Sequence, residues 1–277
     1  LMSLQLSVAP ASAIGPRAEN QDALRVVTPA AELAASKGYL CAMADGVSQC
    51  ADGGLAARST LQALALDYYA TPQTWGVAQA LERLLLAQNR WLQANGGGQP
   101  LLTTLSALVF RGQRFTLAHV GDCRAYRWLD GELQRISEDH VWEQPGMQHV
   151  LKRALGLDQH LVLDFLDGQL RQGECFLLLS DGVWATLGDH SIRAILRETI
   201  EPAHGSYPAA IALAMPVTAR TVRNNDPAAN PATQSRPMIM PPWVCPDSCN
   251  PAPAAADSDA PAGRCFSRIV GASLGAP

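Results

Sequence analysis

Two segments of this chain have the pattern of a buried strand that ends in an aspartate. The apolar run 39–44 leads into Asp45, the run 175–180 leads into Asp181, and a glycine follows each aspartate. A carboxylate at the end of a buried strand loses hydration, at a free-energy cost that a bound cation would offset, and the glycine allows a sharp turn. Carboxylate and carbonyl oxygens are the ligands that hard divalent cations prefer. The two strand ends therefore indicate a site for Mg²⁺ or Mn²⁺.

Further polar residues accompany these strand ends, although Asp-Gly is also one of the commonest turn dipeptides and a single copy is more typical of a plain turn. Arg17 and Asp22 lie in a polar segment upstream, and Asp122 follows the strand pattern 116–120. For each of them the alternative is an ordinary surface or turn residue. Four carboxylates at strand ends or turns, together with one arginine, favour a metal site over unrelated turns.

The order and spacing of these segments resemble those of the type 2C protein phosphatases, the metal-dependent Ser/Thr phosphatases. The resemblance covers roughly residues 3–211 and rests on the segments GPRAENQDA (15–23), AMADGVSQCADGGLAA (42–57), TTLSALV (103–109), HVGDCRAYRW (119–128), KRALG (152–156) and LLLSDGVWATL (177–187). The ADGVS version is most similar to the phosphatase half of bacterial proteins that also carry a Ser/Thr kinase, although the remaining chain has no kinase signature. The family implies phosphorylated proteins as substrates and a cognate bacterial kinase as partner.

The resemblance also implies a metal site made of five residues. Asp45 would bridge two Mn²⁺ or Mg²⁺ ions, the carbonyl of Gly46 would complete the first ion site, and Asp181 would complete the second. Asp22 would ligate the first ion or hold its ordered waters. Asp122 would belong to a third, weaker ion position, where Cys123 replaces the usual serine.

Catalysis in this family hydrolyses a phosphate ester with water and without a protein nucleophile. Two divalent ions can share a hydroxide and neutralise the phosphoryl oxygens. The chain agrees with this route, because it has no G-x-S-x-G elbow, no HExxH and no Cys-x5-Arg loop. Arg17 would bind the substrate phosphate through both arms of its guanidinium, a geometry that lysine lacks. The implied catalytic set is Arg17, Asp45 and Asp181.

Other polar residues near these motifs have structural interpretations. In some relatives a histidine directly after the first Asp-Gly acts as general acid, but Val47 occupies that position here. His119 lies in a buried-type strand and is interpreted as a core histidine, and His140 as part of a structural or substrate-side loop. Thr104 and Ser106 would satisfy hydrogen bonds in the core. Metal-bound water is then the simplest donor of a proton to the leaving group.

Hydrophobic periodicity predicts an α+β fold. Strands are expected at 4–13, 39–44, 103–110, 114–120 and 124–128, and amphipathic helices at 54–69 and 78–92. A run of antiparallel strands after a helix pair is typical of α+β packing. The family implies two central antiparallel β-sheets, a β-sandwich, flanked by helices on both sides, with the metals at one edge.

Composition fits one globular domain, residues 1–215, and excludes several partners. Hydrophobic residues make up 48% of the chain, which suffices for a sizeable core, and a net charge of −4 with a pI near 5.9 provides no basic surface for nucleic acid. Neither a secretion signal nor a membrane-spanning run is visible, so no membrane partner is expected. Seven cysteines without zinc-site spacing are interpreted as thiols of a reducing compartment, and a cytoplasmic location is expected.

Residues 216–277 depart from the family pattern. They hold eleven of the nineteen prolines and no regular apolar periodicity, so they are predicted to be disordered. The family's domain closes with a strand that begins after an aspartate ligand of the second ion. Because no such strand is visible, the sheet edge where it belongs is expected to stand open. Asp226, the nearest acid in the tail, precedes a proline and begins no strand pattern.

A shifted reading frame would explain this departure. When the codons of residues 237–242 are read one nucleotide back, and the Pro237 codon ends in G, they encode Asp-Asp-x-Ala where the family has its acidic turn. Two functions follow from the sequence. The chain is either an active metal-dependent Ser/Thr protein phosphatase, or a truncated phosphatase-like module that is catalytically impaired because the last ligand and the closing strand are missing.

Overall fold

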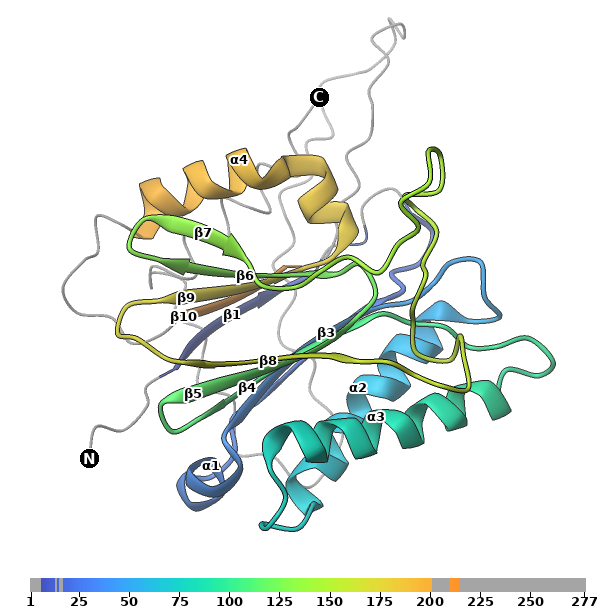
Figure 1. Cartoon of the computed structure of the whole chain (residues 1–277), viewed down its shortest axis with the longest axis horizontal. Helices are drawn as coiled ribbons and strands as arrows, with labels where there is room; N and C mark the ends of the chain where they lie inside the picture. The colour runs from blue at the N-terminus through green and yellow to red at the C-terminus, as the bar shows by residue number, and fades with distance from the viewer. Residues whose placement is uncertain (1–5, 13, 15–16, 201–209, 215–277) are drawn as a thin grey trace, which may run out of the picture.

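The first sheet is built from apolar strands that pair entirely antiparallel. In the computed structural model, which describes residues 6–12, 14, 17–200 and 210–214, its order is β2 (Asp22–Val27), β3 (Tyr39–Asp45), β4 (Leu105–Arg111), β5 (Arg114–Val120) and β8 (Asp164–Gln169). Nearly every side chain of β3, β4 and β5 is buried, because both faces of the sheet are covered. These central strands run through the middle of Figure 1.

The second sheet has the order β1-β10-β9-β6-β7. β6 (Arg124–Leu129) and β7 (Glu132–Arg135) form a hairpin whose turn residues, Asp130 and Gly131, have positive φ angles of 52° and 79°, as a two-residue type I′ turn requires. On its other side β6 pairs antiparallel with β9 (Cys175–Leu179). β10 (Ala210–Ala214) lies between β9 and β1 (Ser7–Ala11) and runs parallel to both.

The two sheets pack face to face around a dry core. Met43, Leu108 and Phe110 of the first sheet meet Phe176 and Leu178 of the second. The rings of Phe110 and Phe176 pack edge to face with centroids 5.2 Å apart, a favourable aromatic geometry. This interior fixes how the strand ends of one sheet lie relative to those of the other.

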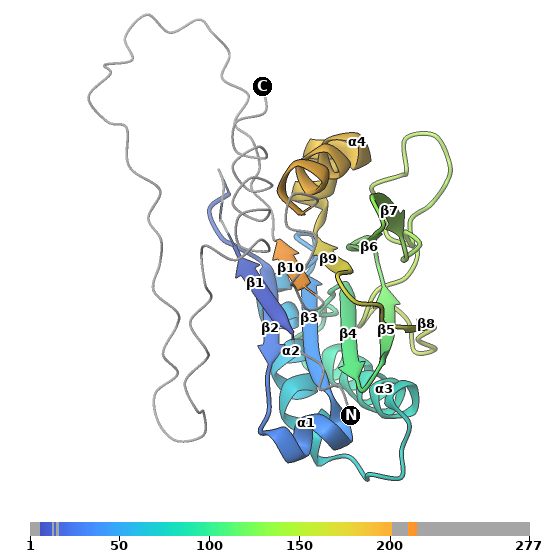
Figure 2. The ribbon, with the colours of Figure 1, turned by 90° about the vertical axis from the view of Figure 1, so that its left-hand side faces the viewer.

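Helices cover the outer faces of both sheets, as Figure 2 shows. On the first sheet, α2 (Gly53–Ala70) and α3 (Val77–Ala94) bury leucines of both helices against the strands, and the short α1 (Ala31–Lys37) connects β2 to β3. On the second sheet, α4 (Asp181–Ile200) packs through Val183, Ile192 and Leu196. Gly188 interrupts α4 with a φ of 70° and kinks it.

The predicted α+β architecture, with two sheets flanked by helices on both sides, is confirmed. Two details differ from the prediction. The second sheet is mixed, because β10 pairs parallel with both of its neighbours. The expectation of an open sheet edge beside β9 is wrong, because the apolar run Ala210–Ala214 supplies a strand there.

Several predictions concern the C-terminal part of the chain. The predicted disorder of residues 216–277, Asp226 and the shifted reading frame all lie outside the described residues. Within the part of the chain that the structure describes, none of the helices combines the length and the apolar character that crossing a membrane requires.

Candidate metal centre

Asp22 and Asp45 face each other across two strands of the first sheet. Asp22 begins β2, Asp45 ends β3, and the antiparallel register places the two residues directly opposite one another. Opposed side chains in such a ladder lie about 5 Å apart, and like charges in this position are destabilising. Asp22 is only 8% exposed, so water screens the repulsion poorly. Two acids in this arrangement need a shared proton or a cation.

The pKa values of Asp22 and Asp45 reflect their burial and the repulsion between the two carboxyl groups. Burial raises the pKa of Asp22 to about 6, although a hydrogen-bonding interaction with Asp45 lowers it. Burial, and after it the negative charge of Asp22, raises the pKa of Asp45 well above its ordinary value. The two carboxyl groups thus compete for a proton as a coupled pair. A divalent cation would replace that proton and remove the repulsion.

The second sheet brings Asp181 and Asp122 to the same edge. Asp181 follows β9 and begins α4, and Asp122 lies in the turn between β5 and β6. Burial, followed by the charge of Asp181, raises the pKa of Asp122 to about 6. The charge of Asp181 also raises the pKa values of Asp22 and Asp45, after burial and their mutual interaction. All four predicted acids therefore lie within electrostatic reach of one another.

Within the part of the chain that the structure describes, three buried oxygen atoms at this edge have no hydrogen-bond partner: Oε1 of Gln21, Oδ2 of Asp22 and Oγ of Ser180. The Ser180 hydroxyl lies close enough to Asp22 to lower its pKa, but the two groups do not reach good hydrogen-bond geometry. A buried polar atom without a partner costs about 1–3 kcal/mol unless water or an ion satisfies it. Hard cations accept all three kinds of oxygen as ligands. The residues present therefore fit a Mg²⁺ or Mn²⁺ site.

The four carboxyl groups lie near one another but do not form a complete set of metal ligands. Within residues 17–200 and the other described segments, no three His, Cys, Asp or Glu side chains are grouped closely enough to hold a metal ion by themselves. Carboxylates repel one another unless a proton or a cation compensates their charge. Four acidic residues carried by the two sheets lie near one edge, and a cation bound among them would offset their repulsion.

The backbone of the first Asp-Gly is fixed from two directions. The N–H of Asp45 donates to Oγ1 of Thr104 at 3.0 Å, and Oγ1 of Thr103 donates to the carbonyl of Asp45 at 2.9 Å. Gly46 donates its N–H to the carbonyl of Gln21 at 3.1 Å. A Cβ atom at Gly46 would lie 2.1 Å from the carbonyl oxygen of Gly53, at the start of α2. Only glycine fits this close approach of two backbones, which positions the Gly46 carbonyl at the acid edge.

Arg17 is exposed and lies beside the same edge. Its positive charge is one of the influences that lower the pKa of Asp22. The structure thus brings the predicted arginine together with the predicted acids. A guanidinium next to such a cluster can attract an anion without displacing the carboxylates.

The interpretation of His119, Ser106 and Thr104 as core residues is confirmed. Nδ1 of His119 lies 2.9 Å from Oγ of Ser106, and its Nε2 lies 2.9 Å from the carbonyl of Glu138. The His119 side chain is buried, which lowers its pKa to about 4, so it is neutral at physiological pH. Thr104 accepts the N–H of Asp45, as described above. None of the three is a ligand in this arrangement.

His140 has a structural role at the turn that carries Asp122. Its Nδ1 accepts the N–H of Gly121 at 3.1 Å, so Nε2 carries the hydrogen and donates to Oδ2 of Asp164 at 2.9 Å. Asp164 also binds Arg153 of the KRALG segment at 2.8 Å. This chain of contacts supports the backbone on one side of Asp122.

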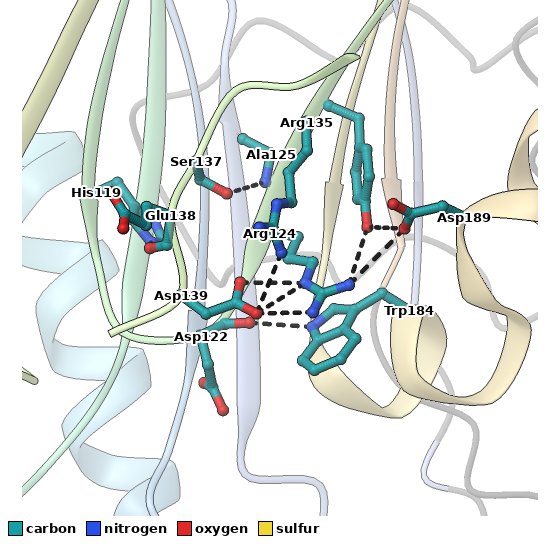
Figure 3. A network of polar contacts seen from close by, with 11 residues as sticks. His119, Asp122, Arg124, Ala125, Arg135, Ser137, Glu138, Asp139, Trp184 and Asp189 are labelled. Atoms are coloured by element: carbon teal, nitrogen blue, oxygen red, sulfur yellow. Dashed lines mark hydrogen bonds and ion pairs between the residues drawn. The ribbon is translucent and has the colours of Figure 1, made fainter. Parts of the chain in front are cut away.

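Sequence reasoning missed the residues that support Asp122 from its other side. Figure 3 shows Arg124 stacked on Trp184 and paired with Asp139, while the Trp184 indole reaches the backbone of Asp122. Arg124 and Trp184 lie inside segments that were recognised for their neighbouring aspartates, but nothing in the sequence indicates that they touch. Gln21 and Ser180 were missed as well, although each directly precedes a predicted ligand.

Comparison with protein families identifies the chain. Residues 11–213 match the family model described as Protein phosphatase 2C. This match spans most of the chain, and the chain therefore belongs to the protein phosphatase 2C family. The resemblance found in the sequence motifs is confirmed, and the matched region includes all four acids of the candidate metal centre and all but the last residue of β10.

Individual relatives are bacterial phosphatases. The chain is similar to the Ser/Thr protein phosphatase PstP of Mycobacterium tuberculosis, with 31% identity over 189 residues that cover 60% of this chain and 36% of PstP. It is also similar to the Ser/Thr phosphatase stp of Listeria monocytogenes, with 24% identity over 143 residues that cover 45% of this chain and 55% of stp. The chain thus spans only about a third to a half of the length of these relatives.

Solved structures show the same fold. PppA, described as a key regulatory component of T6SS in Pseudomonas aeruginosa, superposes with a TM-score of 0.57 at 28% identity, over 72% of this chain and 84% of that one. The catalytic domain of PstP, solved in complex with two manganese ions, superposes with a TM-score of 0.52 at 30% identity, over 65% of this chain and 79% of that one.

Proposed function

We propose that this chain is a metal-dependent phosphatase that hydrolyses phosphoserine and phosphothreonine in proteins. The observation that supports this most directly is the buried pair Asp22 and Asp45, directly opposed at one sheet edge, where Oδ2 of Asp22 has no hydrogen-bond partner among the described residues. A family member with such an edge has the ligand chemistry for the manganese ions that the PstP catalytic domain contains. Phosphorylated proteins from a cognate Ser/Thr kinase are the proposed substrates.

In the proposed site, Asp45 and Asp22 would hold the first ion with the Gly46 carbonyl, Asp45 and Asp181 would hold the second, and Asp122 would serve a third. Two Mn²⁺ or Mg²⁺ ions bound there supply an activated water and neutralise negative charge on the phosphoryl group. The chain contributes two sheets that share a packed core and thereby hold these oxygens in place. Burial of the acids keeps competing water away from the site, which strengthens every charge interaction in it.

Arg17 binds the substrate phosphate in this proposal. It is exposed beside the acid edge, so a phosphate of a protein surface can reach it. The planar guanidinium offers two parallel hydrogen bonds to one phosphate, which orients the ester as well as attracting it. Substitution of Arg17 by lysine keeps the charge and removes this orientation. We expect Arg17→Lys to raise KM for a phosphopeptide and to weaken inhibition by free phosphate, with manganese affinity unchanged.

A cytoplasmic location is part of the proposal. Cys41 and Cys123 are buried free thiols, as expected for a protein of a reducing compartment. Detection of the chain in a cell fraction that contains oxidised, disulfide-bonded proteins would contradict this part alone.

A second function, a catalytically impaired phosphatase-like module, is supported by the direction of β10. β9 ends at the acid edge with Asp181, and β10 runs parallel to β9. The start of β10 therefore lies at the end of the sheet opposite to the acids. An acid that preceded β10, as the family's last ligand precedes its closing strand, would lie a strand length away from the other ligands.

One experiment separates the two functions. Manganese binding is measured by calorimetry, and hydrolysis of a phosphothreonine peptide and of p-nitrophenyl phosphate is measured with and without Mn²⁺. Hydrolysis that Asp181→Asn abolishes supports the active enzyme, and manganese binding without hydrolysis supports the impaired module. A chain that neither binds manganese nor hydrolyses either substrate would overturn both.

A further inference from the structure

Arg124 joins three segments that are distant in sequence. It lies on β6, and its Nε and Nη2 atoms donate to the carboxylate of Asp139 in the loop after β7, at 3.1 and 2.7 Å. Its Nη1 atom lies 3.7 Å from Asp189 of α4, next to the kink, and Tyr126 donates to the same carboxylate at 2.7 Å. These contacts, drawn in Figure 3, connect the second sheet, the loop and the helix through one side chain.

Trp184 extends this unit to the metal centre. The Arg124 guanidinium lies 3.5 Å from the centre of the Trp184 ring, and Nε1–H of the same indole donates to the backbone carbonyl of Asp122 at 3.0 Å. Trp184 belongs to the first turn of α4, which begins with Asp181. One indole therefore connects the turn that carries Asp122 to the helix that carries Asp181.

The contacts of Arg124 stabilise one fixed arrangement of these side chains. The Arg124 and Asp139 side chains are 16% and 15% exposed, so their forked ion pair is poorly screened, and stacking of a guanidinium on an indole adds to it. Without Arg124, the carboxylate of Asp139 would stand near Asp122 with less compensation. Lysine could not replace the arginine, because it offers neither a planar face to the indole nor a fork to the carboxylate.

We infer that Arg124 and Trp184 are positioning residues that hold Asp122 in place relative to Asp181, and so set the affinity of the third ion, which Asp122 would serve. This inference rests on the proposed metal-dependent function. The first ion site is served by Asp22, Asp45 and Gly46, which Arg124 and Trp184 do not contact. Loss of the support therefore weakens one class of ion and spares the other.

Arg124→Lys and Trp184→Phe test the inference. The first variant keeps the charge and removes the fork, and the second keeps a ring beneath Arg124 and removes the N–H that binds Asp122. Arg127→Lys is a matched control on the same strand. Arg127 also donates to a buried carboxylate, that of Glu174, at 2.6 Å, and lies 5.4 Å from the ring of Phe115. None of its hydrogen bonds, ion pairs or ring contacts among the described residues involves a residue of the proposed metal site.

The measurement is a calorimetric titration with Mn²⁺, accompanied by thermal unfolding of each metal-free variant. Partners that orient metal ligands typically contribute about 10–100-fold to metal affinity, and we expect a loss of about tenfold or more in the weaker class of manganese ions for both variants. The tighter class should bind as in wild type. Arg127→Lys should leave both classes unchanged, even where it lowers the melting temperature.

Several outcomes would overturn the inference: wild-type affinities in both variants, an equal loss in both classes of ion, or the same loss in Arg127→Lys. If Arg124→Lys does not fold, Trp184→Phe decides. Manganese binding by wild type without hydrolysis contradicts the proposed activity but leaves the positioning role to be judged from affinities alone. Absence of manganese binding in wild type overturns the metal centre and the positioning role together.

Discussion

At the scale of single residues, the acids at this sheet edge lower the stability of the metal-free fold but would provide ligands for a cation. Asp45 is the carboxyl that all three other acids affect, since Asp22, Asp181 and Asp122 each raise its pKa in addition to burial. A fold that needed only stability would place an amide or an apolar side chain there. In the proposed metal site a cation would compensate these charges, so we expect the metal-free protein to carry a cost that metal binding removes.

Asp45→Asn tests whether the charge of this carboxylate destabilises the metal-free protein. The amide keeps the shape of the side chain and removes the charge, so the metal-free variant should be more stable than wild type, while Mn²⁺ should no longer raise its melting temperature. About 1 kcal/mol corresponds to a shift of roughly 2–4 °C in a domain of this size, and we expect a rise of several degrees. Differential scanning calorimetry with and without Mn²⁺ measures both effects. Asp67→Asn, on the exposed side of α2, should change neither, and a metal-free Asp45→Asn that melts below wild type would contradict the argument.

At the scale of elements, the site depends on where strand ends meet helix starts. β3 ends at Asp45, Gly46 turns the chain, and Gly53 at the start of α2 packs against that turn. A Cβ atom at Gly46 would lie 2.1 Å from the carbonyl oxygen of Gly53 and 2.8 Å from that of Gln21. Both neighbours are backbone atoms, so neither can move aside without shifting an element.

Gly46→Ala should therefore affect stability and metal binding together. Overpacking of this kind costs about 1–3 kcal/mol, and displacement of the Gly46 carbonyl should weaken the tighter class of manganese ions. Urea unfolding and a manganese titration test the two effects. Gly76→Ala is the control, because a Cβ atom at Gly76 meets no atom within 4 Å. Wild-type stability in Gly46→Ala would show that the two backbones can separate freely.

The sequence was informative about elements whose signals are local. The buried runs before Asp45 and Asp181, the two amphipathic helices α2 and α3, and the strands β4, β5 and β6 all follow from periodicity and turn residues. The direct opposition of Asp22 and Asp45 does not, because it depends on the register of β2, whose mixed burial leaves a weak strand pattern. Sequence motifs placed both acids in one site, but not face to face.

Contacts between distant elements were not predictable. Arg124 and Trp184 are sixty residues apart, and they meet only because β6 pairs with β9 and α4 folds back over both. β10 was missed for a similar reason. Its five small or branched apolar residues carry no turn signal or alternation, and their position is determined by the space between β1 and β9. Such features arise from tertiary packing rather than from local preference.

At the scale of the whole molecule, neutral histidines buried beside the sandwich make stability depend on pH. Burial, and then the neighbouring His140, lowers the pKa of His119 from 6.5 to about 4. Between these values the unfolded chain binds a proton that the folded chain excludes. The contribution of His119 to stability is therefore present above pH 6.5 and is lost as the pH falls toward 4.

Urea unfolding of wild type and His119→Asn at pH 6.5 and pH 5 isolates the contribution of His119. The raised pKa values of Asp22 and Asp122 change stability in the opposite direction as the pH falls. Because they do so in both proteins, their effect cancels in the difference. Each pH unit is worth about 1.4 kcal/mol for one group, so wild type should lose on the order of 2 kcal/mol more than the variant over this interval. Equal losses in both proteins would show that His119 is protonated in the folded state.

The domain boundary at residue 215 is also a prediction about the whole molecule. Every described strand, including β10, and all three core clusters lie at or before Ala214, and residues 216–277 are rich in proline and poor in apolar periodicity. A chain that ends after Met215 keeps the strand between β1 and β9, so it should melt within a few degrees of the full chain and bind manganese equally. A chain that ends after residue 209 loses β10, separates β1 from β9, and should melt clearly lower because a new sheet edge is exposed. Equal melting temperatures for the two shortened chains, measured side by side, would mean that β10 does not support the sheet. A large loss on removing 216–277 alone would place part of the folded domain in that segment.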